Sequence, residues 1–409
     1  MAKLAIKGGK PVRTKPLGVA WPIYDEREIE ALAEVVRSGE WGGTPGREVR
    51  EFEREFADFC DAKHAICLTN GTAALEVSLR AVGVEPGDEV IVPAYTFIAT
   101  ASSVVMIGAL PVFVDIEPGT FNLDPQQIEP AITERTKAIV PVHIAGRPAD
   151  MDGIMEVAER HGLKVVEDAC QAHGAEWRGQ KVGTIGDAGA FSHQASKHIN
   201  AGEGGTIVTN DEEVYLRCYS LVNLGRIPEG EWYQHEYLGS NYRMTNFQAA
   251  ILRVQLSRWE EQAKRREENA AYLNSLLREV DGISTMDEDK RITRQAWHAF
   301  KFRYHPEHFG GVPKTRFCQA MAAEGVPCGG WYQPLYRSGL FRRFSAYLAS
   351  KGYFGARKID YTAISLPVVE NVCENEDVGF SQRVLLGTRK DLEDIAAAIL
   401  KVRKYCDEL

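Results

Sequence analysis

The chain has 409 residues, of which 44% are hydrophobic and 26% charged, and its formal net charge is −9. This composition is that of a soluble globular protein long enough for two domains. The acidic balance, without a long basic run, argues against nucleic acid or an anionic membrane surface as a partner, and no apolar run is long enough to span a membrane.

Residues 1–20 are expected to form an extended arm, because Pro11, Pro16 and Gly18 interrupt regular structure. The start of this arm lacks the apolar run of a signal peptide. The eight cysteines contain no C-x-x-C pair, which excludes the usual zinc and thioredoxin-like motifs. Together these features predict a protein of the reducing cytoplasm without a bound metal.

Residues 21–255 alternate between short apolar strands and helical patterns, and we predict that they form the large domain. The expected strands are 65–68, 90–92, 112–114, 139–142, 165–167, 188–191 and 206–208, with helices such as 73–82 and 151–161 between them. This alternation indicates βαβ units, and therefore an α/β fold with a mainly parallel sheet. In such sheets, ligands bind at the carboxyl ends of the strands.

After residue 255 the pattern changes. Residues 256–280 predict a charged connecting helix, and residues 281–409 predict a smaller α+β domain. Within this domain we expect strands at 299–304 and 363–366 and a last helix from 391 to 405.

The first candidate site is the turn Thr69-Asn70-Gly71-Thr72-Ala73, where a strand ends and a helix begins. Free amides at the helix N-terminus, together with the Thr72 hydroxyl, suit a phosphate group. An ordinary capped helix is the alternative. The turn is neither a Walker A loop nor a G-x-G-x-x-G motif, so it does not indicate a nucleoside triphosphate or a dinucleotide.

Two charged residues at other strand ends extend this site. Asp168 ends an apolar strand, where an unpaired carboxylate is costly and would need a cation such as a protonated pyridine nitrogen. Strand alternation points Glu167 to the opposite face. Lys197 lies in a stretch of small residues, a setting that suits a lysine which forms a Schiff base with an aldehyde cofactor. Alternatively, Asp168 could form a structural ion pair, and Lys197 could be an ordinary solvated lysine.

Further candidates follow two neighbouring strands. The segment Pro93-Ala94-Tyr95-Thr96-Phe97 brings aromatic rings to a strand end, where a ring can stack on a planar heterocycle or simply pack in the core. We take Tyr95, and His143 after the strand at 139–142, as candidates for substrate contact.

Six motifs follow one another along the chain: Asn70-Gly71-Thr72-Ala73-Ala74, Pro93-Ala94-Tyr95-Thr96-Phe97, Glu167-Asp168-Ala169, Phe191-Ser192 with Lys197, Glu203-Gly204-Gly205 and Asn241-Tyr242-Arg243-Met244. In these motifs and their order the chain resembles the DegT/DnrJ/EryC1/StrS family of pyridoxal-phosphate aminotransferases. The resemblance implies the aspartate-aminotransferase-like fold, fold type I, with a large cofactor-binding domain and a smaller C-terminal domain.

The resemblance also implies a role for each matching residue. Lys197 would be the Schiff-base lysine and Asp168 the partner of the pyridine nitrogen. The segment Trp331–Tyr336 resembles the family's substrate-side Tyr-x-Pro-Leu motif, which makes Tyr332 a substrate residue. The remaining cofactor contacts would be Gly71, Thr72, Ala73, Ser192 and Gln194 at the phosphate, Phe97 against the ring, and Gln171 beside the ring hydroxyl.

Asn241 matches an asparagine that reaches the phosphate of the neighbouring subunit, which implies a homodimer with shared active sites. It follows the strand series, so no βαβ crossover places it near Thr72 of its own chain. His193 stands where many relatives carry an aromatic residue.

The implied reaction transfers the amino group of glutamate or glutamine to a nucleotide-linked keto sugar or to a keto cyclitol. Residues 380–387 resemble glutamine-dependent scyllo-inosose aminotransferases and 3-amino-5-hydroxybenzoate synthases, so an aromatising synthase is an alternative. A regulator that binds the cofactor without turnover is another. A nucleotide sugar needs cations for its diphosphate, which Arg226, Arg337, Arg342 and Arg343 could supply, whereas a neutral cyclitol needs none.

Overall fold

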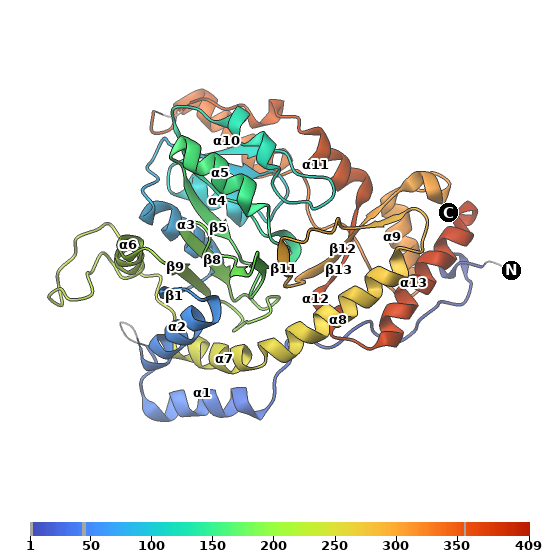
Figure 1. The fold of residues 1–409 in the computed structure, drawn as a ribbon, viewed down its shortest axis with the longest axis horizontal. Coiled ribbons are helices and arrows are strands. Elements are labelled where there is room, and N and C mark those ends of the chain that lie inside the picture. Colours follow the sequence, from blue (N-terminus) through green and yellow to red (C-terminus); the bar gives the residue numbers. More distant parts are fainter. Residues whose placement is uncertain (1–2, 43–45, 356) are drawn as a thin grey trace.

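The computed structural model describes residues 3–42, 46–355 and 357–409 (Figure 1). At its centre lies a seven-stranded sheet in the order β1-β9-β8-β5-β4-β2-β3. Only β9 runs antiparallel to its neighbours in this sheet, so the predicted mainly parallel sheet is confirmed. The strands are β1 (His64–Leu68), β2 (Glu89–Pro93), β3 (Leu110–Val114), β4 (Thr136–Ile139), β5 (Lys164–Asp168), β8 (Ala188–Ser192) and β9 (Gly205–Thr209).

Helices cover both faces of this sheet. Successive residues of β2 face opposite apolar clusters, with Val90 and Val92 on one side and Ile91 on the other. Both faces are therefore buried, which explains why the strands appear in the sequence as continuous apolar runs. The first cluster includes residues of α3 (Gly71–Ala81), α4 (Ala99–Met106) and α6 (Glu212–Val222), and the second includes residues of α2 (Arg47–Cys60) and α5 (Met151–His161).

The predicted connecting helix at 256–280 corresponds to α8 (Trp259–Leu277), which follows directly on α7 (Asn246–Ser257) in the lower half of Figure 1. Arg258 lies between them and pairs with Asp25 and Glu28. Helix α7 packs on α1 (Glu26–Ser38) and α2, whereas α8 packs on α12 (Gln382–Leu385) and α13 (Arg389–Lys404). The pair therefore joins the large domain to the small one. No helix among the described residues is both long and apolar enough to cross a membrane.

The small domain is built on an antiparallel sheet of β10 (Ile283–Thr285), β12 (Ala299–Tyr304) and β13 (Asp377–Ser381), with α9 (Lys314–Ala323) and α13 packed beside it. The predicted strand at 299–304 is confirmed. The predicted strand at 363–366 is wrong: Tyr361–Ala363 form a short helical turn, and residues 364–366 belong to no strand. From this turn Tyr361 packs against Phe113 of the large domain. A minor sheet of β6 (Glu176–Trp177), β7 (Gln180–Lys181) and β11 (Ile292–Arg294) links the two halves of the chain.

The structure departs from the predicted division of the chain in two places. Residues 335–372, which contain α10 (Gly339–Lys351) and α11 (Pro367–Asn371), contribute Phe341 and Phe344 to a core cluster of the large domain. The described part of the predicted arm belongs to the small domain instead, because Leu4 and Leu17 are buried in that domain's core. In both cases the apolar side chains decide where the segment packs.

Candidate active site

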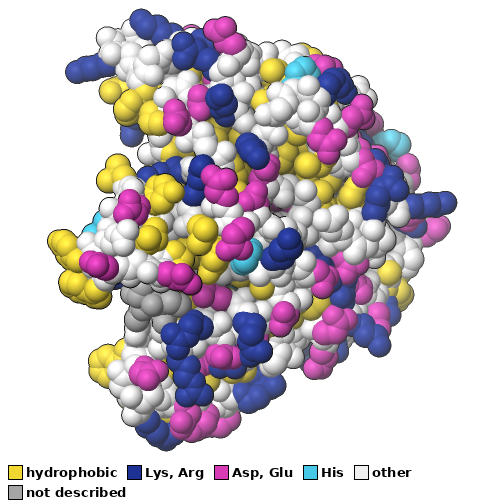
Figure 2. Space-filling view, turned by 60° about the vertical axis from the view of Figure 1, so that its left-hand side comes forward, with side chains coloured by type: hydrophobic (Ala, Val, Ile, Leu, Met, Phe, Trp, Pro, Cys, Tyr) yellow, Lys and Arg dark blue, Asp and Glu magenta, His cyan; other side chains and the backbone are white. Residues whose placement is uncertain are grey.

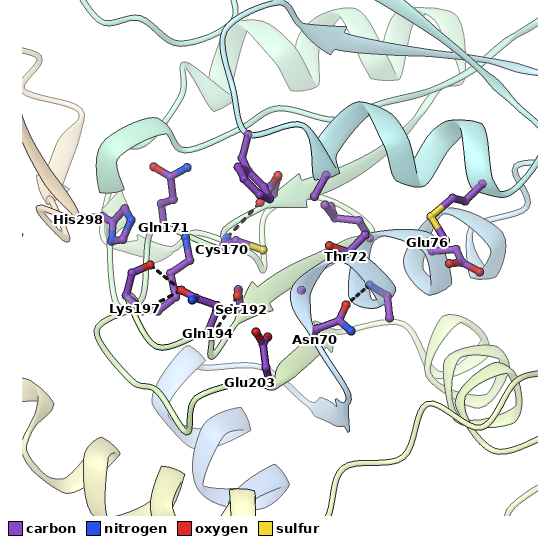
Figure 3. A pocket seen from close by; sticks show the side chains of 18 of the residues that line it. Asn70, Thr72, Glu76, Cys170, Gln171, Ser192, Gln194, Lys197, Glu203 and His298 are labelled. Carbon is purple, nitrogen blue, oxygen red and sulfur yellow. Dashed lines mark hydrogen bonds between the residues drawn. The ribbon is translucent and has the colours of Figure 1, made fainter. Parts of the chain in front are cut away.

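A cavity of about 740 Å³ opens at the carboxyl ends of β1, β5 and β8, as the parallel sheet predicts (Figure 3). It brings together most of the residues that the sequence singled out. Those predicted residues are Gly71, Thr72, Ala73, Phe97, Asp168, Gln171, Ser192, Gln194, Lys197 and Tyr332.

The first wall of the cavity is the N-terminus of α3. Asn70 caps this helix by accepting a hydrogen bond from the Ala73 amide at 2.9 Å. The amides of Gly71 and Thr72 have no partner among the described residues. A side chain at Gly71 would place its Cβ 2.7 Å from the Cβ of Ser192, so only glycine lets the helix approach β8 this closely. The two open amides and the helix dipole form a site for an anion.

Asp168 lies at the end of β5 with its carboxylate held from two sides. Thr100 donates its hydroxyl to Oδ2 at 2.7 Å, and the Cys170 amide donates to Oδ1 at 3.2 Å. The residue is 5% exposed, and no Lys or Arg among the described residues forms an ion pair with it. Glu167 points away, as strand alternation predicts, and accepts three backbone amides from the 183–186 turn. Asp168 is therefore a buried, oriented carboxylate without an ion-pair partner among the residues described.

Lys197 reaches the cavity from the loop between β8 and β9. Its Nζ has no hydrogen-bond partner among the described residues. Burial lowers the pKa of this amine, while Cys170 and Asp168 act in the opposite direction. The lower pKa enriches the neutral, nucleophilic form of the amine. Trp21 and Gln382 hold the loop through the carbonyls of Ala195 and Ser196, at 2.8 and 3.1 Å respectively.

Gln171 connects the cavity floor to its substrate side. Its Oε1 accepts the Ala145 amide at 2.9 Å, and its Nε2 donates to the Tyr332 hydroxyl at 3.2 Å. Burial raises the pKa of Tyr332, so the phenol remains protonated. The Gln194 side chain is already used within its loop, where Oε1 accepts from both the amide and the hydroxyl of Ser196.

Two predicted substrate residues do not reach the cavity. Tyr95 is completely buried and donates its hydroxyl to Asp377 at 2.6 Å. His143 is completely buried between Glu167, at 2.9 Å, and the Ala149 amide, at 3.1 Å. The structure therefore contradicts direct substrate contact by either residue, because both side chains are hydrogen-bonded behind the cavity wall.

Asn241 is exposed and does not line the cavity of its own chain. Its neighbours nevertheless do come close to that cavity. Tyr242 lines it and donates its hydroxyl to Glu76 at 3.2 Å, and Arg243 pairs through its backbone with Leu68 of β1. Asn241 itself therefore stays outside the cavity of its own chain, although the chain returns beside β1 after α6.

Sequence reasoning missed several residues that complete the site. Thr100 orients Asp168 from a helix 68 positions away, a contact that no local pattern reveals. Glu76, Cys170 and His298 line the cavity. Cys170 follows the carboxyl end of β5 by two positions, so the strand-end rule could have indicated it. His298 precedes the start of β12, where that rule gives no signal.

His193 points away from the cavity and fills an aromatic position in the core. Its Nδ1 donates to the Ile199 carbonyl at 3.0 Å, and its Nε2 accepts the Thr206 hydroxyl at 2.8 Å. Its ring lies 5.5 Å from that of Phe52 and 5.4 Å from that of Phe56. Three more buried histidines continue from it toward the cavity, with ring centroids 5.5 to 5.7 Å apart: His173, His198 and His298.

We expect stability to fall steeply with acidification below neutral pH. Burial lowers the pKa of His193 to about 4 and keeps those of His173, His198 and His298 well below 6.5. The unfolded chain therefore binds protons first, so stability present above pH 6.5 is lost as the pH falls toward 4, by up to about 1.4 kcal/mol per pH unit for each histidine. The free energy of unfolding, measured with urea at several pH values in this range, should depend less steeply on pH in His193→Phe than in the wild type. An unchanged pH dependence would show that the low pKa of His193 does not contribute to the acid sensitivity.

The family model of the DegT/DnrJ/EryC1/StrS aminotransferase family matches residues 22–401. A protein of Streptoalloteichus tenebrarius with the provisional name L-glutamine:3-amino-2,3-dideoxy-scyllo-inosose aminotransferase is 42% identical, over 100% of this chain and 99% of its own length. An L-glutamine:2-deoxy-scyllo-inosose aminotransferase of the same organism is 39% identical over 99% of both chains. The crystal structure of 3-amino-5-hydroxybenzoic acid synthase superposes with a TM-score of 0.86, at 35% identity, over 96% of this chain and 100% of that one.

Proposed function

Because the chain belongs to the DegT/DnrJ/EryC1/StrS aminotransferase family, we propose that it transfers the amino group of glutamine to a free keto cyclitol. Its class is that of an aminotransferase, and family membership implies pyridoxal phosphate as the cofactor. The names of its relatives support glutamine as donor and a scyllo-inosose derivative as acceptor.

The residues of the cavity fit this cofactor. The open amides of Gly71 and Thr72, with the Ser192 hydroxyl, suit its phosphate. Asp168 offers the negative charge that a protonated pyridine nitrogen needs, and the unpartnered amine of Lys197 suits its aldehyde. When bound, pyridoxal phosphate supplies an electron sink for negative charge that develops on the substrate carbon.

Side chains of this protein would carry out the proton transfer and orient the cofactor and the substrate. Lys197 Nζ would remove the α-proton of the donor, a role that needs the neutral amine favoured by burial. Asp168 would keep the ring nitrogen protonated, and Thr100 would hold the carboxylate in the orientation that this requires. Gln171 and Tyr332 would orient the substrate side through their shared hydrogen bond.

One observation favours a free cyclitol over a nucleotide-linked sugar. Among the described residues that line the cavity, Lys197 is the sole lysine or arginine. Arg226, Arg342 and Arg343 do not line it, and Arg337 is paired with Glu370 and Glu374 at 2.9 and 2.6 Å. A diphosphate would therefore find no cation of this chain once Lys197 has bound the cofactor, whereas the hydroxyl groups of a cyclitol need none.

An acceptor screen tests the proposal. Purified protein with pyridoxal phosphate is given glutamine or glutamate, and then scyllo-inosose, its deoxy and aminodeoxy derivatives, or a nucleotide-linked keto sugar. We expect an aminated cyclitol with glutamine as the better donor. Amination of the nucleotide sugar alone would overturn the acceptor class. Formation of an aminohydroxybenzoate would favour the aromatising alternative, and cofactor binding without any product would favour a regulator.

The protein is further proposed to act as a homodimer with shared active sites. The segment after α6 projects at the left of Figure 1 and carries Trp232, Tyr233 and Leu238, which are 77%, 76% and 86% exposed. Figure 2 shows hydrophobic side chains gathered on this face. Such exposed apolar groups support contact with a second copy of the chain. All eight cysteines are free, which supports a reducing compartment such as the cytoplasm.

Asn241 tests the sharing of sites. If its amide binds the partner's phosphate, Asn241→Ala should weaken cofactor affinity by about 10- to 100-fold, the equivalent of a hydrogen bond to a charged group. At a cofactor concentration too low to load Asn241→Ala, mixing it with inactive Lys197→Ala should restore activity, because one site of each mixed dimer keeps both residues. Asn375→Ala, an exposed asparagine on the small domain, is the matched control for affinity. An active monomer, or no recovery after proven subunit exchange, would refute shared sites.

A further inference from the structure

We propose that a buried cluster of Tyr95, Lys301 and Asp377 is a positioning device that holds Trp331 and Tyr332 as the acceptor-side wall of the cavity. This inference rests on the proposed function, since it concerns the acceptor of that reaction.

The cluster joins the two domains behind the cavity. Asp377 accepts the Tyr95 hydroxyl at 2.6 Å through Oδ2 and the Lys301 ammonium at 2.6 Å through Oδ1. Lys301 also donates to the Tyr95 hydroxyl at 3.2 Å. Tyr95 and Asp377 are completely buried, and Lys301 is 4% exposed. The polar groups of the cluster are thus paired with one another, which offsets the cost of burying their charges.

The same cluster binds the segment that forms the cavity wall, residues 329–335. This segment starts on the small domain, where Gly329 and Gly379 of β13 exchange backbone hydrogen bonds, and it ends where the Leu335 amide donates to Ala94 at 3.0 Å. In its middle, the Trp331 amide donates to Asp377 Oδ2 at 2.9 Å, and the Lys301 ammonium lies 4.6 Å from the centre of the Trp331 ring. The cluster therefore fixes the part of the segment between its two anchors.

Tyr95 transmits this positioning to the substrate side. Its ring meets that of Tyr332 edge to face, with centroids 5.2 Å apart and planes at 84°. The Tyr332 hydroxyl in turn accepts the hydrogen bond from Gln171. A shift of the cluster would thus move both Trp331 and Tyr332, which line the cavity.

Stability alone does not explain a buried ion pair at this place. Replacing such pairs by apolar residues of similar volume is often neutral or stabilising. What the pair does supply here is directional contact with one backbone amide, one phenol and one indole ring. Those contacts matter most for a rigid ring-shaped acceptor, which cannot adapt to a displaced wall as an open-chain amino donor can.

The test is Asp377→Asn, assayed separately in the two half-reactions. We expect the acceptor kcat/KM to fall by about 10- to 100-fold, because a misplacement of the order of 1 Å has effects of that size. The donor half-reaction, followed as the absorbance change that glutamine causes in the bound cofactor, should stay within about 2-fold. Glu376→Gln is the matched control, because Glu376 directly precedes β13 and pairs with Arg303 of β12, so this change breaks a neighbouring ion pair without touching the wall segment.

A double variant separates a loss of stability from a loss of positioning. Lys301→Met/Asp377→Asn leaves no unpaired buried charge, so the protein should regain stability while the acceptor kcat/KM stays low. Equal losses in both half-reactions, or a wild-type acceptor kcat/KM in the double variant, would overturn the inference. If the wild-type enzyme aminates no cyclitol, the proposed function fails by itself. The positioning role is then judged by hydrogen exchange of the Trp331 amide, which must accelerate in Asp377→Asn but not in Glu376→Gln.

Discussion

Replacement of Lys197 by alanine is expected to abolish turnover while the protein stays folded and still binds pyridoxal phosphate. The side chain makes no hydrogen bond with the described residues, so its loss removes no structural contact of that kind. The phosphate site keeps the amides of Gly71 and Thr72. Loss of the proton-transferring amine alone should cost about 10²- to 10⁴-fold, and loss of covalent attachment should reduce turnover further.

Borohydride reduction provides a readout independent of activity. In the wild-type protein, mass spectrometry should find the reduced cofactor attached to the peptide that contains Lys197, and Lys197→Ala should carry no adduct after the same treatment. Lys137→Ala, which removes an exposed lysine of β4, should be labelled like the wild type. An adduct mapped to another lysine, or none in the wild type, would refute the assignment.

The large-domain fold could be predicted because its strands are buried on both faces. A strand such as β2, with every residue buried, leaves an unmistakable apolar run in the sequence. Residues 335–372 show the limit of this reasoning. Their pattern reveals that Phe341 and Phe344 must be buried, but not that they pack against the large domain instead of the small one. Periodicity identifies a buried face and says nothing about the surface that covers it.

Strand β13 escaped prediction for a related reason. It begins with Asp377, a charged residue that normally argues against a buried strand. Its charge is tolerated because Lys301, 76 positions earlier in the sequence, is buried beside it. A pairing over such a distance leaves no local signal, so the strand appears in the sequence as part of a polar loop.

The site was predictable where the argument was local. Strand alternation separates Asp168 from Glu167, and the structure has these side chains on opposite sides. The same kind of argument failed for Tyr95, although Phe97, which follows the same strand, does line the cavity. Phe97 is 58% exposed at the cavity, whereas Tyr95 is buried under the small domain. The difference arises from β13 and residues 329–335, whose position depends on tertiary packing.

Asp168→Asn should reduce turnover by several orders of magnitude while leaving the fold intact. Asparagine has nearly the same shape and can still accept the hydrogen bond from Thr100 or from the Cys170 amide. It carries no negative charge, however, so it cannot hold a proton on the ring nitrogen, and the ring becomes a poor acceptor of electrons. Removal of a buried carboxylate that fixes the protonation of a ring nitrogen costs on the order of 10⁴-fold in the serine proteases, and we expect a comparable loss here.

A comparison with Thr100→Val separates the charge of Asp168 from its orientation. Valine removes the hydroxyl that donates to Oδ2 at 2.7 Å but leaves the carboxylate in place. This variant should lose about 10- to 100-fold in kcat, the equivalent of one hydrogen bond to a charged group, and far less than Asp168→Asn. Steady-state kinetics with saturating cofactor measures both variants, and the absorbance of the bound cofactor confirms that each one is loaded. Near-normal turnover in Asp168→Asn would place the partner of the ring nitrogen elsewhere. Equal losses in the two variants would instead mean that Asp168 acts through its hydrogen bonds and not through its charge.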